Sequence, residues 1–159
     1  MSLLEAATAA FPNAVISTHS NFGDDTVIVR KESIVSICEA LHQRPEFDFD
    51  YLIDITAVDN VQLGETPRFH VVYHLYSLAK NHRIRLKVPV DADHLQVDSV
   101  TRIWPSANWL EREVWDMFGI QFTGHPNPKR ILMYEGFEGY PLRKDYPYRK
   151  RQPLIGPMN

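Results

Sequence analysis

The chain has 159 residues, of which 44% are hydrophobic and 23% charged, and a formal net charge of −3. This length is typical of one domain, large enough to bury a core without disulfides or metals. The single cysteine, Cys38, excludes an intrachain disulfide and a zinc or iron–sulfur site built on the chain's own cysteines. The slightly acidic net charge gives no overall basic surface for nucleic acid, and no apolar run reaches the ~18 residues of a membrane span.

The N-terminal part predicts a helix, a hairpin and a second helix. Residues 2–10 are Ala-rich and lack the basic start of a signal peptide, so we expect a helix that Pro12 ends. Two β-branched runs, at 14–18 and 26–30, flank a turn-rich stretch and predict a hairpin. A helix closed by Pro45 follows, with apolar residues at helical spacing: Ile34, Ile37, Cys38 and Leu41.

Three strand signals follow, over residues 51–59, 68–77 and 82–88, and residues 78–81 are short enough for a hairpin between the last two. Alternating apolar and polar residues predict strands with one buried and one wet face. The expected inward residues are Tyr51, Ile53, Ile55 and Ala57, then Phe69, Val71, Tyr73 and Leu75, then Ile84, Leu86 and Val88, with Arg83, Arg85 and Lys87 outward. We therefore expect an α+β body with an antiparallel or mixed sheet of about five strands and helices packed on one face.

Two late helices are predicted after the sheet. The first covers residues 98–104 and is stopped by Pro105. The second begins at Asn108, which we take as the N-cap with Glu111 as the capping residue three positions later, and Gly119 is placed as its C-terminal cap. The apolar stripe of this helix consists of Leu110, Val114, Met117 and Phe118.

The second late helix also carries the nearest approach to a carboxylate cluster. The structural interpretation gives Glu111 to capping, Asp116 to an exposed ion pair with Arg112, and Glu113 to solvent. The alternative is a small acid/base enzyme that uses Glu113 and Asp116, which share a side of the helix. We favour the structural interpretation because charges along one helix face are ordinary for an amphipathic helix.

No pattern of metal or cofactor binding stands out. His70 and His74 are four residues apart, but on a strand that spacing is about 13 Å, too long to share an ion. Zinc-helix, dinucleotide, P-loop and nucleophile-elbow motifs do not occur in the sequence. Cys38 is expected in the core, and Trp104, Trp109 and Trp115 in the core or a subunit interface.

The C-terminal part differs from the body in charge and composition. Residues 1–124 contain 10 Lys and Arg against 17 Asp and Glu, whereas residues 125–159 contain 7 against 3, together with 6 of the 11 prolines. We therefore divide the chain into an α+β body (1–124) and an extended, basic, Pro-rich arm (125–159). Such an arm can bind single-stranded nucleic acid or a groove of an acidic protein partner. We favour the acidic protein partner over nucleic acid, because the body has no basic face.

Residues 108–147 closely resemble the signature of the C-subunit family of proton-pumping NADH:quinone oxidoreductase, respiratory complex I. Three blocks carry the resemblance, at 111–120 (EREVWDMFGI), 124–132 (GHPNPKRIL) and 139–146 (GYPLRKDY). Upstream, DITAVD at 54–59 and YHLY at 73–76 are similar to the family, and RQPL at 151–154 is similar to some bacterial members.

The resemblance implies a non-catalytic subunit of the peripheral arm, on the cytoplasmic side of the bacterial inner membrane. The family member binds no cofactor itself, whereas the complex uses NADH, FMN, iron–sulfur clusters and quinone. Its implied partners are the other hydrophilic subunits, chiefly the large quinone-site subunit, with no nucleic acid and with membrane contact only through the complex. The equivalent subunit of a membrane-bound hydrogenase, or of another donor-fed relative, is the alternative.

The resemblance also assigns residues. Arg143, Lys144 and Tyr146 are the expected anchors on the neighbouring subunit, where a desolvated charge pair costs about 2–5 kcal/mol to break. The complete set of signature or partner-binding residues is Glu111, Arg112, Glu113, Asp116, Gly119, His125, Pro126, Arg130, Pro141, Leu142, Arg143, Lys144, Asp145 and Tyr146.

Overall fold

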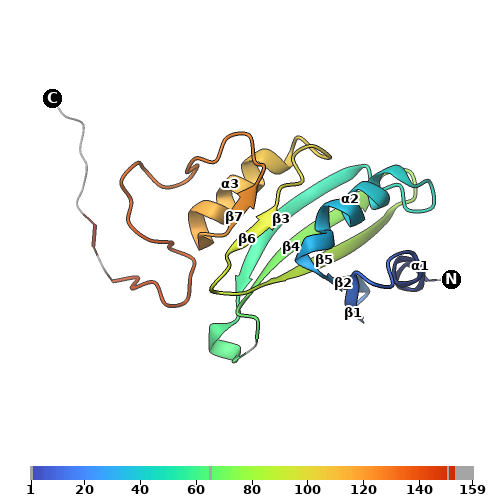
Figure 1. Ribbon diagram of the computed structural model, residues 1–159, viewed down its shortest axis with the longest axis horizontal. Coiled ribbons are helices and arrows are strands. Elements are labelled where there is room, and N and C mark those ends of the chain that lie inside the picture. The colour runs from blue at the N-terminus through green and yellow to red at the C-terminus, as the bar shows by residue number, and fades with distance from the viewer. Residues whose placement is uncertain (1, 65, 150, 153–159) are drawn as a thin grey trace.

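A computed structural model describes residues 2–64, 66–149 and 151–152 and shows a five-stranded mixed sheet with three α-helices (Figure 1). The strand order is β1-β2-β5-β4-β3, in which β2 and β5 run parallel and all other neighbours antiparallel. The strands of this sheet are β1 (Val15–Asn21), β2 (Asp24–Val29), β3 (Tyr51–Asp59), β4 (Phe69–Ser77) and β5 (His82–Val90). The helices are α1 (Leu3–Ala10), α2 (Ile34–Gln43) and α3 (Ala107–Phe118), with the short turns η1 (Lys31–Ser33) and η2 (Val61–Leu63). The α+β prediction with a mixed sheet is confirmed.

All three α-helices contribute to one hydrophobic core. The α1 helix begins at a capping box, in which Ser2 Oγ accepts from the Glu5 N–H at 3.2 Å and the Glu5 carboxylate accepts from the Ser2 N–H at 2.8 Å. The predicted inward residues of α2 and of β4 and β5 are all buried in this core, Cys38 among them. Burial raises the pKa of the Cys38 thiol, so the group stays protonated and packs as a small apolar side chain.

The predicted alternation is wrong at the start of β3. Leu52 is buried there, whereas Tyr51 and Ile53 are 52% and 47% exposed. The cause is a β-bulge: the pairing with β4 shifts register between Leu52 and Asp54. One extra residue reverses the side-chain phase. After the bulge, Ile55 and Ala57 face the core as predicted.

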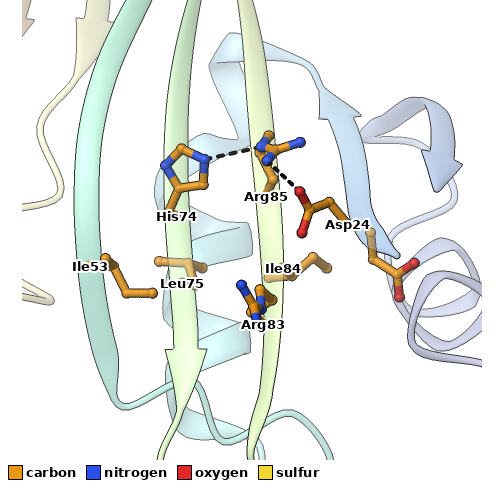
Figure 2. A pocket seen from close by; sticks show the side chains of 8 residues that line it. Asp24, Ile53, His74, Leu75, Arg83, Ile84 and Arg85 are labelled. Atoms are coloured by element: carbon orange, nitrogen blue, oxygen red, sulfur yellow. Dashed lines mark hydrogen bonds and ion pairs between the residues drawn. The ribbon is translucent and has the colours of Figure 1, made fainter. Parts of the chain in front are cut away.

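The outer face of the sheet carries the cationic side chains of β5. In its middle, Arg85 donates to His74 Nε2 at 3.0 Å and to Asp24 Oδ2 at 3.2 Å (Figure 2). Burial, together with the nearby Arg85 charge, lowers the pKa of His74, so the imidazole stays neutral and accepts the bond.

The segment before α3 does not form the helix predicted over residues 98–104. Its first residue, Asp98, instead ends the short strand β6 (Gln96–Asp98). This strand pairs in parallel with β7 (Gln121–Thr123), which follows α3 in the sequence. Irregular turns follow β6, and α3 starts at Ala107, one residue before the predicted cap Asn108. Gly119 ends α3 with φ +75°, as predicted.

The β1–β2 hairpin contains a strained residue that a substitution can relieve. Phe22 is fully exposed with φ +56°, and Gly23 follows with φ +85°, a pair of left-handed residues for which Asn-Gly is preferred. We predict that Phe22→Asn raises the free energy of unfolding by about 0.5–1 kcal/mol, because asparagine tolerates this conformation. Urea unfolding measures the change. Phe22→Val should lower stability, and equal stability of the two variants would contradict the argument.

Candidate functional site

The arm, residues 125–152 as far as the structure describes them, lies beyond the C-terminal end of α3, at the opposite end of the molecule from α1 (Figure 1). Its described residues form turns and bends without a helix or strand. An irregular segment needs bonding partners for its backbone groups. The body provides several of these partners, and the resulting junction is the candidate site.

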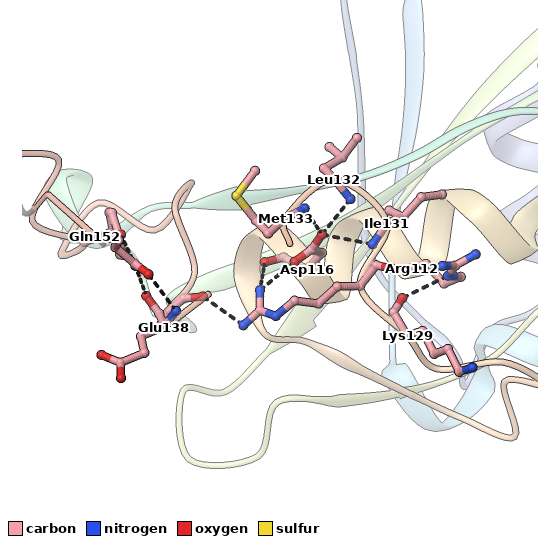
Figure 3. Close-up of polar contacts among 11 residues, drawn as sticks. Arg112, Asp116, Lys129, Ile131, Leu132, Met133, Glu138 and Gln152 are labelled. Atoms are coloured by element: carbon pink, nitrogen blue, oxygen red, sulfur yellow. Dashed lines mark hydrogen bonds and ion pairs between the residues drawn. The ribbon is translucent and has the colours of Figure 1, made fainter. Parts of the chain in front are cut away.

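A buried carboxylate on α3 holds the first part of the arm. Asp116 is fully buried, and its Oδ2 accepts three successive backbone N–H groups, those of Ile131, Leu132 and Met133, at 3.0, 2.8 and 2.9 Å (Figure 3). Its Oδ1 accepts from the Arg130 guanidinium. Successive N–H groups curved around one anion form a backbone nest, here filled by a side chain of the protein itself.

The ionised form of Asp116 is favoured by these donors. Burial by itself would raise the pKa of this carboxyl, but the hydrogen bonds from the three N–H groups and from Arg130 outweigh burial and lower it. Arg130 also donates to the Gly139 carbonyl at 3.2 Å and lies over the rings of Trp115, Phe137 and Tyr140. One ion pair therefore joins α3 to two separate parts of the arm.

A second ion-pair group holds the later part of the arm at the end of β3. Asp59 accepts two bonds from Arg68, at 2.8 and 2.7 Å, and one from the Lys144 N–H at 2.9 Å. Arg68 also donates to Asp145 at 2.9 Å. The bonds from Arg68, with those from backbone N–H groups, lower the pKa of Asp59 to about 2. Arg68 thus bridges a carboxylate of the body and one of the arm.

Side chains of the arm pack directly against Gly119, the C-cap glycine of α3. Arg143 donates to the Phe118 carbonyl and its guanidinium lies 4.4 Å from the centre of the Tyr140 ring. A Cβ atom added to Gly119 would lie 2.5 Å from Arg143 Nη2 and 2.7 Å from the Tyr140 ring. Gly119 is therefore required both for its positive φ and for this close approach.

Glu111 fastens the segment before α3 and is not a capping residue, contrary to the prediction. Its side chain is fully buried and accepts from Ser99 Oγ at 2.7 Å and from the Val100 N–H at 2.8 Å. Desolvation raises the pKa of Glu111 to about 7, although both hydrogen bonds act in the other direction. A buried carboxyl that titrates near neutrality is a feature shared with acid/base sites.

His125 lies beside Glu111 and fixes the start of the arm. Its Nδ1 accepts from the Asn127 N–H at 3.0 Å, so Nε2 carries the proton and donates to the Asn108 carbonyl at 2.9 Å. The same Nε2 lies 3.9 Å from the Glu111 carboxylate. Both side chains border a cavity of about 420 Å³ that Arg112, Trp115, Phe122 and Pro128 also line.

The last described residue closes the arm on itself. The Gln152 amide nitrogen donates to the Glu138 carbonyl at 2.7 Å, and its oxygen accepts from the Glu138 N–H at 3.1 Å (Figure 3). The same nitrogen also donates to Tyr146 Oη at 3.0 Å. Tyr146 packs against Gly139, where an added Cβ would lie 2.8 Å from the ring.

The structure thus brings most of the predicted site residues together, but in different pairs. Arg112 does not bind Asp116; it donates to the carbonyls of Lys129 and Arg130, at 2.9 Å each. Glu113 is exposed as predicted and does not share a side with the buried Asp116. Among the other signature residues, Pro126, Leu142 and Lys144 are exposed, and Pro141 is half-buried. Binding of a partner by any of them remains a prediction.

Several residues of the junction were missed as site residues. Asp59 and Gln152 were noted only within blocks similar to the family, and Arg68 and Ser99 were not singled out at all. The one local signal was an acidic residue at a strand end followed by a turn, which Asp59 supplies. Its pairing with the arm crosses 85 residues of sequence and leaves no local pattern.

The buried carboxylates of the junction have their hydrogen-bonding capacity used by donors of the chain itself. Asp116 and Asp59 are saturated by donors, and Glu111 has a partner on each oxygen. Within the residues described, the structure shows no group of three metal-ligating side chains and no helix long and apolar enough to cross a membrane.

The chain matches the family model of the respiratory-chain NADH dehydrogenase 30 Kd subunit over residues 27–152. It is 45% identical to a Rhizobium meliloti (strain 1021) protein named as a C-subunit of NADH-quinone oxidoreductase, covering 98% of this chain and 84% of that protein. It is 50% identical to the protein of the same name from Roseiflexus sp. (strain RS-1), covering 91% and 82%.

Two solved structures share the fold. One is a trypsin-resistant fragment (1-134) of Nqo5, with a TM-score of 0.67 and 33% identity, covering 79% of this chain and 96% of the fragment. The other belongs to the membrane-bound sulfane sulfur reductase, an archaeal respiratory membrane complex, with a TM-score of 0.73 and 26% identity, covering 90% and 82%.

Gly119 and Gly124 form a matched pair for testing the junction. Both have positive φ, but a Cβ on Gly124 meets nothing within 4 Å. We predict that Gly124→Ala costs about 1 kcal/mol from backbone strain alone. Gly119→Ala should cost more, and only this variant should speed trypsin cleavage of the arm, because it displaces Tyr140 and Arg143. Urea unfolding measures the loss of stability, and timed proteolysis measures the release of the arm. Equal losses of stability in the two variants would contradict close packing of the arm against Gly119.

Glu111 should make stability depend on pH near neutrality. Its pKa is raised from 4.5 to about 7 on folding, so the stabilising contribution of the protonated form is complete below pH 4.5 and is lost as the pH rises through 7. The loss is about 3 kcal/mol at 1.36 kcal/mol per pKa unit. We predict that Glu111→Gln removes this loss, measured as unfolding free energy from pH 5 to 8. Glu113→Gln is the exposed control, and an unchanged slope in Glu111→Gln would contradict the assignment.

Proposed function

The chain belongs to the family of the respiratory-chain NADH dehydrogenase 30 kDa subunit, the C-subunit of NADH-quinone oxidoreductase, and we propose that it acts in its complex as a non-catalytic structural subunit. In this role it packs against the large quinone-site subunit and supports electron transfer from NADH to quinone by holding its neighbours in place. Electron transfer depends on relative placement, so a rigid spacer contributes to the reaction without bond-making of its own.

The observation that carries this proposal is how the arm is arranged on the body. Two of its charged groups bond inward, Arg130 to Asp116 and Asp145 to Arg68, while several large apolar side chains stay outward. Leu132, Tyr134, Leu142 and Tyr148 are 56%, 41%, 51% and 81% exposed. Exposed apolar side chains on a rigidly bonded segment are typical of a surface that another protein covers.

The anchors proposed from the resemblance divide into two kinds. Arg143 and Tyr146 bond within the chain, to the Phe118 carbonyl and to Gln152, and would act by positioning the arm. The Lys144 side chain is exposed and can reach a partner directly. We propose that the interface with the large subunit joins Lys144 and the outward apolar residues of the arm.

The cofactors of the reaction are proposed to lie outside this chain. NADH, FMN, iron–sulfur clusters and quinone would be held by other subunits, on the cytoplasmic side of the bacterial inner membrane, with this chain peripheral. Support comes from the use of the buried carboxylates, which are saturated by structural donors.

The electron donor is a separate question, because a similar fold occurs in a sulfane sulfur reductase. The equivalent subunit of a membrane-bound hydrogenase or another donor-fed complex is the second candidate. The identity of the co-purifying subunits distinguishes the two: NADH- and flavin-binding subunits support the first candidate, and a hydrogenase subunit supports the second.

We predict that a tagged full-length chain, expressed in its native host and extracted in mild detergent, co-purifies with flavin and iron–sulfur subunits. Leu142→Asp should lower both this recovery and the NADH:quinone activity of membranes by about tenfold or more, because it places a charge in an apolar interface. Leu63→Asp is the matched control, since Leu63 is 72% exposed on η2, outside the arm. A chain recovered alone from native membranes would contradict the proposal.

A further inference from the structure

A second apolar surface lies where the start of β3 meets the start of α3. An open hollow of about 620 Å³ separates the start of β3 from the start of α3, lined among others by Tyr51, Pro105 and Leu110. Trp109 projects beside it with 70% of its surface exposed, and Tyr51 is half-exposed. Tryptophan and tyrosine are enriched among the residues that carry binding energy at protein interfaces.

The β3 bulge joins this hollow to the outer face of the sheet. The register shift turns Ile53 outward, and its side chain lines a further hollow of about 220 Å³ with His74, Arg83 and Arg85 (Figure 2). Ile53 therefore borders both hollows. Because β3 is an edge strand, apolar residues exposed here are the kind that soluble proteins normally replace with charges or proline.

The polar part of this surface carries charges of both signs, because Asp24 and Asp25 line the smaller hollow together with Arg83 and Arg85. Arg85 is bonded to Asp24, whereas Arg83 is exposed and makes no ion pair within the part of the chain that the structure describes. Burying an unpaired guanidinium is costly, so an occupant must bring a carboxylate to Arg83.

The first residue of the arm comes near this surface, where His125 donates to the Asn108 carbonyl, whereas the later part of the arm is bound at the other end of β3. Tyr51 pairs with Tyr76 at one end of β3, and Asp59 pairs with Phe69 at the other, where Lys144 is bound. Tyr51 and Asp59 are eight residue steps apart along the strand, about 26 Å at ~3.3 Å per residue. One partner segment could not fill both surfaces without crossing the body.

We propose that Tyr51, Ile53, Arg83 and Trp109 form a second docking surface, which binds a segment of another subunit that carries an apolar side chain beside a carboxylate. The apolar side chain fills the hollow between Ile53 and Trp109, and the carboxylate pairs with Arg83. This inference rests on the proposed function and adds a second contact, so that the chain bridges two neighbours, one at each end of β3.

The test uses the full chain in its native complex. Trp109→p-benzoylphenylalanine introduces a photo-crosslinker, and Glu39→p-benzoylphenylalanine on the exposed side of α2 is the control position. We expect a crosslink from position 109 to one segment of a neighbouring subunit, with an Asp or Glu within a few residues of the attachment point. Arg83→Glu in the same chain should reduce this crosslink by about tenfold or more, whereas Lys31→Glu, the same charge change at the other end of the sheet, should not.

Three outcomes would overturn the inference: no more crosslinking from position 109 than from position 39, a crosslink to a second copy of this chain, or a yield that Arg83→Glu leaves unchanged. The two proposals fail in different ways. If the proposed function is wrong, the unsubstituted chain is recovered without respiratory subunits. If only the second surface is wrong, the particle is recovered intact without the position-109 crosslink.

Discussion

The arrangement of the arm depends on one fully buried carboxylate. Asp116 accepts from three consecutive backbone N–H groups and from Arg130, so it satisfies backbone donors that a helix or strand would otherwise satisfy. The carboxylate is tolerated in the interior only because its donors are complete, and removing a partner of such a pair costs about 3–5 kcal/mol. Gly119, Arg143 and the Asp59–Arg68 group then extend the same junction to the end of the sheet.

This arrangement explains the uneven charge along the chain. The acidic excess of residues 1–124 and the basic excess of residues 125–159 are partly neutralised within the molecule, by the ion pair between Asp116 and Arg130. The composition alone suggested that the basic groups face a partner. In the structure, Arg130 and Arg143 face inward, and the outward side of the arm carries exposed charged residues, such as Lys129 and Arg149, beside exposed large apolar ones.

Local patterns predicted most of the sheet and all three α-helices closely, and they also predicted a helix over residues 98–104 that does not form. The Ala-rich start, the hairpin and the alternation of β4 and β5 all follow from short-range periodicity. The β3 bulge was not predicted because one extra residue has no sequence signature. Strands β6 and β7 were not predicted because strands of three residues depend on pairing with each other. At the site, Asp116 was noticed but given the wrong partner, because helical spacing points to Arg112 whereas burial selects Arg130.

The parallel pairing of β2 with β5 also constrains how the chain folds. Thr26 lies beside Arg85, across 59 residues of sequence, whereas β3, β4 and β5 are joined by local turns. Closing so long a loop is entropically unfavourable until the strands within it have formed. During synthesis the β1–β2 hairpin therefore leaves the ribosome before β5, the strand with which β2 pairs. It can join the sheet only after β3, β4 and β5 have been made.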